Sequence, residues 1–263
     1  MRTSEWVVVA YFLYLLATAA MLRARVGAVL RLGACALPTC VVVVALATAH
    51  GFPVVPVLRD WLPGAYVMIG YWATGLLFRG PATALETRLE AWDERLFALL
   101  GPVMARLPSL VRELVEFAYL CCYPLVPAGI AVLYAIGARS RADSFWTVVL
   151  TSTFAAYAVL PWAGTRPPRA LEGGVRKADY LFQRVNLVVL ARGSIQVNTF
   201  PSGHAASACS VALFMTTVPG APWLEFGLFA VAIGAGAIAG RYHYALDVVA
   251  GVGVAVAAFV VLA

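Results

Sequence analysis

Two histidines stand at the edges of apolar stretches in a chain that carries few charges. His204 ends the sequence Pro-Ser-Gly-His at 201–204, and His243 stands four residues before Asp247. A titratable side chain at a membrane boundary is costly unless it has a partner, so such residues mark candidate functional sites. The sequence holds three histidines in all, and we interpret these two as its candidate chemistry.

The spacing of His243 and Asp247 suits a carboxylate that orients an imidazole. Side chains four residues apart share one face of a helix, so we expect Asp247 to accept a hydrogen bond from one ring nitrogen of His243. The other nitrogen keeps its lone pair, and an imidazole held in this way is a better nucleophile or base than a free one. A purely structural hydrogen bond is the alternative interpretation.

The sequence at 201–204 predicts an anion site at the start of a helix. Pro201 suits the first helical turn, with one of the two preceding residues as the cap. The unpaired N–H groups and the dipole of a helix start favour an anion, Gly203 allows close approach, and the Ser202 hydroxyl adds a donor. His204 lies one step inside and can donate a proton. An ordinary helix start is the alternative.

A basic segment precedes this helix start. Residues 163–200 carry six basic side chains and two acidic ones. Such a segment is basic either because it faces the cytoplasm or because it holds an anion, and both explanations stay open. Arg166, Arg169 and Arg241 have the fork-shaped side chains that neutralise phosphate oxygens and the charge that develops in phosphoryl transfer.

The composition predicts an all-α integral membrane protein. The 263 residues are 62% hydrophobic and 12% charged, whereas soluble domains are about half apolar and about a quarter charged. Continuous apolar runs are typical of spanning helices rather than barrel strands. The runs at 61–78 and 205–218 are the weakest, so we expect a polytopic bundle of six to eight helices, with candidates at 6–22, 32–49, 61–78, 114–136, 145–162, 205–218, 223–239 and 244–263. Their loop lengths place the three polar motifs on one membrane face.

No repeat or linker divides the chain. We expect residues 1–60 to form N-terminal transmembrane helices and residues 61–263 to form the membrane domain that carries the site. Charged and apolar residues alternate at helical spacing near 85–100, which predicts an amphipathic helix in the membrane interface or a solvated connecting helix. Gly236 and Gly240 have a spacing that serves helix packing within one chain or a homo-oligomer.

Several partner classes are not expected. The net charge of +6 comes from dispersed basic residues without a basic stripe, so we expect no nucleic acid. The five cysteines lie in apolar runs without metal-ligand spacing, and no dense acidic cluster suggests Mg²⁺. We therefore expect no metal and no cofactor.

Roughly the last 150 residues resemble the type 2 phosphatidic acid phosphatases (the PAP2 superfamily), whose fold is shared with vanadium haloperoxidases. Residues 201–204 match the second family motif, and His243 with Asp247 matches the end of the third. The resemblance implies a core of that fold, in which His243 is the nucleophile that forms a phosphohistidine, Asp247 orients it, and His204 is the general acid. It also implies that Ser202, Gly203 and arginines bind the phosphate.

The chain departs from the family pattern at two places. The first motif has a Lys seven residues before Arg-Pro, and Val159 stands at that distance from Arg166. The third motif has Ser-Arg upstream of the histidine, where this chain has Gly236 and Ala237. Arg241, one helical turn further on, is a candidate replacement.

A second candidate replacement is Arg169. The sequence Pro-Pro-Arg at 167–169 and the segment 119–124 are similar to the branch of the superfamily that includes inositol phosphorylceramide synthases. That branch transfers a phosphorylated head group between lipids.

The leading hypothesis is a metal-independent membrane phosphatase or phosphotransferase that acts on a lipid phosphate, with arginines supplying the positive charge. One alternative is a head-group phosphotransferase like the inositol phosphorylceramide synthases. Another is a noncatalytic lipid-binding or transport protein, which the missing Lys favours. A haloperoxidase-like site is disfavoured in so apolar a chain. The lipid and the acceptor, water or a lipid alcohol, are left open.

Two arguments about topology disagree. Counting basic residues over eight helices assigns the site face to the cytoplasm, because Arg23, Arg25, Arg31 and the arginines of 79–112 share it. The resemblance implies the extracytoplasmic face of the inner (cell) membrane. We expect the latter, because anion binding explains some of those arginines. The run at 6–22 exceeds the usual length of a signal-peptide core, so we expect a retained helix.

Overall fold

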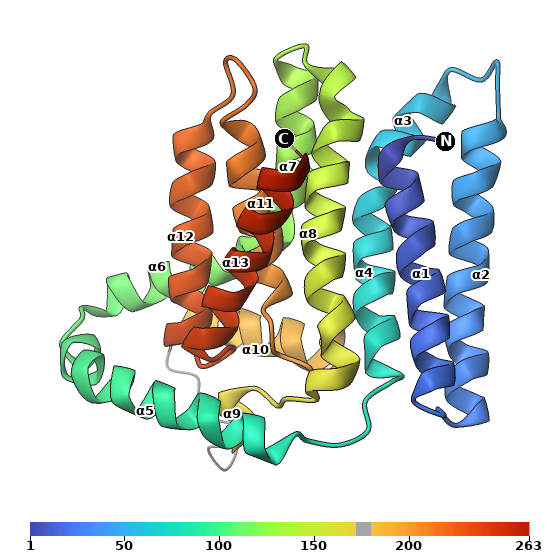
Figure 1. Ribbon diagram of the computed structural model, residues 1–263. Helices are drawn as coiled ribbons and strands as arrows, with labels where there is room; N and C mark the ends of the chain where they lie inside the picture. The colour runs from blue at the N-terminus through green and yellow to red at the C-terminus, as the bar shows by residue number, and fades with distance from the viewer. Residues whose placement is uncertain (172–179, 263) are drawn as a thin grey trace.

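The computed structural model describes residues 1–171 and 180–262, and throughout these residues the chain is helical without a β-strand. Part of the basic segment, residues 172–179, lies outside the described residues. Figure 1 shows that the long helices run roughly along one direction and form a bundle. These helices are α1 (Thr3–Met21), α2 (Val26–Thr48), α4 (Pro63–Gly75), α7 (Cys122–Ala135), α8 (Ala142–Ala163), α11 (Gly203–Met215), α12 (Trp223–Ala239) and α13 (Ala245–Leu262).

Shorter elements close the two ends of this bundle (Figure 1). The end that carries both chain termini also has α3 (Val54–Trp61) and the 3₁₀ turn η1 (Arg139–Arg141). The opposite end, which we call the site end, has α5 (Thr83–Ala105), α9 (Pro168–Leu171) and α10 (Leu181–Gly193), and α6 (Ser109–Leu120) leads from α5 back to the bundle. The predicted all-α helical bundle is confirmed.

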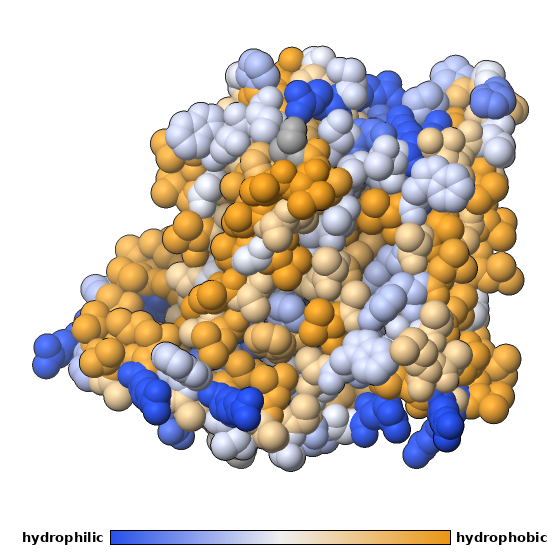
Figure 2. Space-filling model, viewed as in Figure 1, coloured by the Kyte–Doolittle hydropathy of each residue, from blue (hydrophilic) through white to orange (hydrophobic). Residues whose placement is uncertain are grey.

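The lengths and compositions of the helices suit a membrane. Four helical segments are long and apolar enough to cross a bilayer, namely α1, α2, Arg139–Leu171 and α13, and α6 with α7 makes a fifth if their 60° bend is a break within one span. The apolar helices α11 and α12 are shorter. Figure 2 shows hydrophobic side chains along the flanks of the bundle and hydrophilic ones gathered at its two ends, as a bilayer requires.

Two expected runs are not single continuous helices. The run at 61–78 is divided between the end of α3 and the short α4. The run at 114–136 breaks at Cys121. Pro124 explains this break, because proline has no N–H to continue the helical hydrogen bonds and its ring crowds the carbonyl one turn earlier.

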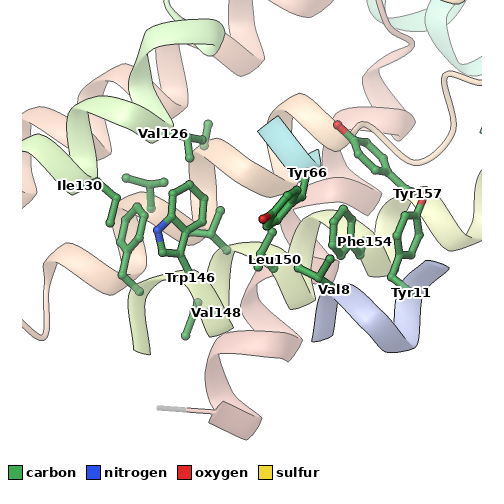
Figure 3. Packing of buried hydrophobic residues seen from close by; sticks show 14 of the residues in the cluster. Val8, Tyr11, Tyr66, Val126, Ile130, Trp146, Val148, Leu150, Phe154 and Tyr157 are labelled. Atoms are coloured by element: carbon green, nitrogen blue, oxygen red, sulfur yellow. The ribbon is translucent and has the colours of Figure 1, made fainter. Parts of the chain in front are cut away.

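Helix α8 is the most buried of the candidate spans. In the packing that Figure 3 shows, Trp146, Leu150 and Phe154 of α8 lie among side chains from neighbouring helices. Tyr11 of α1 stacks on Phe154 with ring centroids 4.0 Å apart. The indole N–H of Trp146 donates to the carbonyl of Asp60 at 2.7 Å. Contacts along its length therefore fix where α8 ends, which is at the site.

Helix α5 crosses the site end of the bundle (Figure 1) and contains the amphipathic segment predicted near 85–100. Glu86 and Asp93 are buried against the bundle, whereas Trp92 is 55% exposed and Leu99 is 76% exposed. This pattern suits a helix with one side on the protein and apolar side chains available to lipid. Its position in the membrane interface stays a prediction.

Helices α11 and α13 approach closely at Gly251. A Cβ atom at this position would lie 2.3 Å from the carbonyl oxygen of Ser202. The amide of Ser202 also donates to the carbonyl of Asp247 at 2.9 Å. The start of α11 and the first turn of α13 are thereby set against each other. Gly236 of α12 likewise faces the carbonyl of Val115 in α6, so it packs within the chain, and a homo-oligomer stays a prediction.

We predict that Gly251→Ala lowers stability, because its methyl group has no room beside a backbone carbonyl. Overpacking of this kind costs about 1–3 kcal/mol, and we expect a lower apparent melting temperature in detergent. Gly253→Ala is the matched control, since no atom lies within 4 Å of a Cβ at that position of the same helix. Equal melting temperatures for the two variants would contradict the close contact.

Candidate active site

His204, His243 and Asp247 meet at the site end of the bundle. Nδ1 of His243 lies 3.3 Å from Oδ2 of Asp247. Nε2 of His243 lies 3.4 Å from Nδ1 of His204. Both histidines line one pocket, and Asp247 lies behind them, fully buried. The structure therefore brings together the three residues that the sequence singles out.

The pairing of His243 with Asp247 has a different local geometry from the one expected. His243 lies in the turn before α13, and Asp247 lies in the first turn of that helix, so the two do not share a helix face. Oδ2 of Asp247 also accepts the amide of Tyr244 at 3.1 Å. A carboxylate at the third helical position commonly bonds the backbone N–H just before the helix in this way. One oxygen thus orients both the backbone turn and the imidazole.

Helix α11 begins two residues later than expected. It starts at Gly203, and Ser202 is the N-cap, because its hydroxyl accepts the amide of Ala205 at 3.2 Å. Serine is a strong N-cap residue, which explains why the cap is not one of the residues before Pro201. Ser202 is fully buried and is not among the described residues that line the pocket, whereas Gly203 and His204 are.

Tyrosines surround the His204 ring. The rings of Tyr119 and Tyr123 each meet it edge-on with centroids 5.8 Å apart. Tyr119 also stacks on Tyr242 at 4.2 Å. The bend between α6 and α7 separates Tyr119 from Tyr123 and brings both to the imidazole. These contacts restrict the His204 ring to one orientation.

A loop after α10 closes the pocket from another side. Thr165, which follows α8, joins this loop to the bundle: its hydroxyl accepts the amides of Thr199 at 3.1 Å and Phe200 at 3.0 Å. Gln196 and Asn198 have positive φ angles of 60° and 62°. Both line the pocket, and Oδ1 of Asn198 is buried without a hydrogen-bond partner among the residues that the structure describes. Strained backbone and an unsatisfied polar atom at one place are typical of a functional site.

Among the described residues, Arg169 is the arginine that lines the pocket together with the two histidines. Its guanidinium lies 5.3 Å from the centroid of the Tyr242 ring, and Nη2 donates to Oε1 of Gln196 at 3.2 Å. Nη1 is buried and has no hydrogen-bond partner within residues 1–171 and 180–262. A buried, charged donor without an acceptor is costly unless a ligand supplies the acceptor.

The other two candidate arginines are directed to α5 instead. Arg166 makes a two-pronged ion pair with Glu86 at 2.8 and 3.1 Å, and Nη1 of Arg241 lies 2.5 Å from Oδ2 of Asp93. Burial opposes ionisation of Glu86, but the hydrogen bonds and charge of Arg166 outweigh it and lower the pKa of Glu86. Neither arginine is among the described residues that line the pocket.

Several residues that line the pocket could not be identified from the sequence. Tyr71 and Tyr157, from α4 and α8, and the loop residues Gln196 and Asn198 line the pocket although nothing in their local sequence singles them out. Helix packing and the backbone course of one loop bring them there. Tyr119 and Pro167 also line the pocket, and their segments, 119–124 and 167–169, gave a partial indication through their similarity to one branch of a family.

These features define a class: an apolar helical bundle whose buried carboxylate orients a histidine beside a second histidine and an arginine with an open donor. A sequence model of the PAP2 superfamily matches residues 91–261, so the chain belongs to that superfamily. Membership supports a phosphatase- or phosphotransferase-type function and an integral membrane protein. A comparison with curated proteins found no significant match, and neither did a comparison with solved structures.

We predict that Arg169→Gln weakens the binding of inorganic phosphate. A hydrogen bond to a charged group contributes about 1.5–3 kcal/mol, so the dissociation constant should rise about tenfold or more. Phosphate-dependent thermal protection of the detergent-solubilised protein measures this. Arg192→Gln, which removes the same charge from an exposed position at the end of α10, should bind as the wild type does. Unchanged binding by Arg169→Gln would exclude it as a phosphate ligand.

Proposed function

We propose that this protein is an integral-membrane lipid phosphatase or phosphotransferase that works through a phosphohistidine on His243. The observation that carries the proposal is the convergence of the buried Asp247, the two histidines and the open donor of Arg169 on one pocket. Each supplies one requirement of phosphoryl transfer: an orienting base, a nucleophile, an acid and a neutralising charge.

In the first step, Nε2 of His243 forms a bond to phosphorus while the bond from phosphorus to the lipid oxygen breaks. Asp247 accepts the Nδ1–H of His243, which leaves the lone pair on Nε2 for the attack and stabilises the positive charge that the ring gains. Burial and the charges of His243 and Arg169 lower the pKa of His204, and the negative charge of the substrate phosphate favours the protonated form instead. The protonated His204 gives its proton to the departing oxygen, so the lipid leaves as a neutral alcohol.

In the second step, the oxygen of water or of a lipid alcohol attacks phosphorus and the bond to Nε2 breaks. His204, neutral after the first step, accepts the proton of the attacking oxygen and is ready for a new cycle. Arg169 neutralises the phosphate oxygens in both steps. We propose no metal ion for this chemistry, because the guanidinium already supplies positive charge beside the nucleophile. The acceptor decides whether the enzyme is a phosphatase or a transferase.

A lipid substrate is supported by where the pocket lies. The site end is the end of a bundle whose flanks are apolar (Figure 2), so we expect a phosphate at headgroup depth to lie near the level of the histidines. Helix α5 crosses the same end and exposes Trp92 and Leu99. Anchoring of these side chains in the interface favours a substrate that arrives along the membrane rather than from solution.

We predict that His243→Ala abolishes phosphate release and phosphoryl transfer in mixed micelles of lipid phosphate, with and without a lipid alcohol. In His204→Ala the rate of phosphate release and transfer should fall about 10²–10⁴-fold. The fall should be smaller with a substrate whose leaving group needs no proton. His50→Ala is the matched control, since this histidine is exposed and lies on the loop before α3.

Trapping labelled phosphate on the protein separates the roles of the two histidines. His204→Ala should still accept label from a substrate with a good leaving group, whereas His243→Ala should not. A well-folded His243→Ala protein with wild-type turnover would exclude the phosphohistidine mechanism and favour a noncatalytic, lipid-binding role.

We propose that the site end faces the extracytoplasmic side of the inner membrane, and cysteine accessibility tests this. Thr87 on α5 and Thr216 after α11 are both exposed, at opposite ends of the bundle. In a protein without its five native cysteines, Thr87→Cys should react with an impermeant reagent in intact cells. Thr216→Cys should react only after permeabilisation. The reverse pattern would place the site in the cytoplasm.

A further inference from the structure

Helix α5 holds the turn that carries His243. Asp93 of α5 is 1% exposed, and its Oδ2 accepts from Nη1 of Arg241 at 2.5 Å. Its Oδ1 accepts from the amide of Ala245 at 2.9 Å. Arg241 and Ala245 lie two residues before and two residues after His243. One carboxylate therefore fixes the backbone on both sides of the nucleophile.

The backbone that Asp93 holds is strained. Arg241 has a φ of 59°, a left-handed conformation that is costly for a residue with a side chain. Its guanidinium packs 4.7 Å from the centroid of Phe97, also on α5, and its carbonyl accepts the amide of Arg169 at 3.3 Å. The contacts of Arg241 with α5 therefore influence both His243 and Arg169.

A second carboxylate, that of Glu116, binds Tyr242, the residue between Arg241 and His243. Oε2 of Glu116, on α6, accepts from the hydroxyl of Tyr242 at 2.7 Å and from Nδ2 of Asn186 at 2.8 Å. The Tyr242 ring in turn packs against the guanidinium of Arg169. Two buried acids, Asp93 of α5 and Glu116 of α6, thus hold the backbone and side chains around His243. Their partners are Arg241, Tyr242 and Ala245.

A buried acid at this place is costly. Burial raises the pKa of Asp93, the Ala245 amide and Arg241 lower it, and the negative charge of Asp247 raises it again, so that its pKa lies above the usual value. An apolar side chain serves helix packing as well as a buried ion pair does, and often better. The presence of a carboxylate near the charge of Asp247 therefore favours a geometric role over a purely stabilising one.

We propose that Asp93 is a positioning residue for phosphoryl transfer, which acts through Arg241 and Ala245 to hold His243 in line with the phosphorus and to keep Arg169 beside it. Asp93 does not touch the substrate. This inference rests on the proposed function.

The test compares Asp93→Asn, which keeps an acceptor for Ala245 but loses the charge opposite Arg241, with Asp93→Ala, which loses both. We expect kcat to fall about tenfold to a hundredfold in Asp93→Asn and further in Asp93→Ala, with KM changed less than about threefold. Arg241→Met should lower kcat as much as Asp93→Asn does. The variant that combines Asp93→Asn with Arg241→Met should have a kcat no lower than either single variant. Glu94→Gln, an exposed neighbour on the same helix, is the matched control and should keep the wild-type kcat.

A second readout does not need turnover. The rate at which diethyl pyrocarbonate modifies His243, followed by mass spectrometry, should differ between wild type and Asp93→Asn and should be unchanged in Glu94→Gln. If Asp93→Ala aggregates, the kcat values of Asp93→Asn and Arg241→Met test the positioning role of Asp93. If the wild type has no phosphatase or transferase activity, the proposed function fails, and the modification rates alone test the position of His243.

Two results would overturn the inference. One is a wild-type kcat in Asp93→Asn. The other is a loss of kcat that accompanies a lower melting temperature while the reactivity of His243 stays at the wild-type rate, since that combination describes a merely stabilising acid.

Discussion

The hydrogen bonds of Asp247 are the constraint on which the rest of the site depends. Its side chain binds both the His243 ring and the amide of Tyr244, and its own carbonyl accepts the amide of Ser202. One fully buried residue therefore joins His243, the start of α13 and the start of α11. Burying a carboxylate is expensive, and its Oδ1 has no hydrogen-bond partner within the described residues. That cost is acceptable where the charge stabilises an imidazolium that forms during the reaction.

The arginines at the site end have two different roles: some form ion pairs within the protein, and one has a donor that a ligand can use. Arg166 and Arg241 neutralise Glu86 and Asp93 on α5, so their guanidinium groups tie this helix to the bundle. Arg169 keeps a buried donor in the pocket for which the described part of the chain supplies no acceptor. Because an anion gains most from a donor that is not already satisfied, the proposed binding of phosphate depends on this division. It also explains why a sequence with several nearby arginines does not reveal which of them binds phosphate.

The sequence predicted the class of fold, and it singled out three residues that the structure brings together, for physical reasons. Long apolar runs have few alternatives to membrane helices, and His204, His243 and Asp247 stand out because ionisable groups are rare in such runs. It did not predict local geometry: Ser202 rather than an earlier residue caps α11, and His243 lies in a turn rather than on a helix face. Contacts between distant segments, such as Asp93 with Arg241, leave no periodic pattern in the chain, so sequence reasoning on a single chain missed Asp93.

The departure from the first family motif has a structural explanation in the register of α8. Counting back from Arg166 as the motif requires leads to Val159, which is 38% exposed on the outer side of α8. The pocket side of this helix is occupied by Tyr157 and Leu160. A lysine at 159 would therefore have to reach around the helix to meet a phosphate. Arg169, beyond the left-handed Gly164 that ends α8, approaches the pocket from the loop instead. Arg169 thus brings a positive charge to the pocket from the segment after the helix, and under the proposed function it would be a relocated phosphate ligand rather than a lost one.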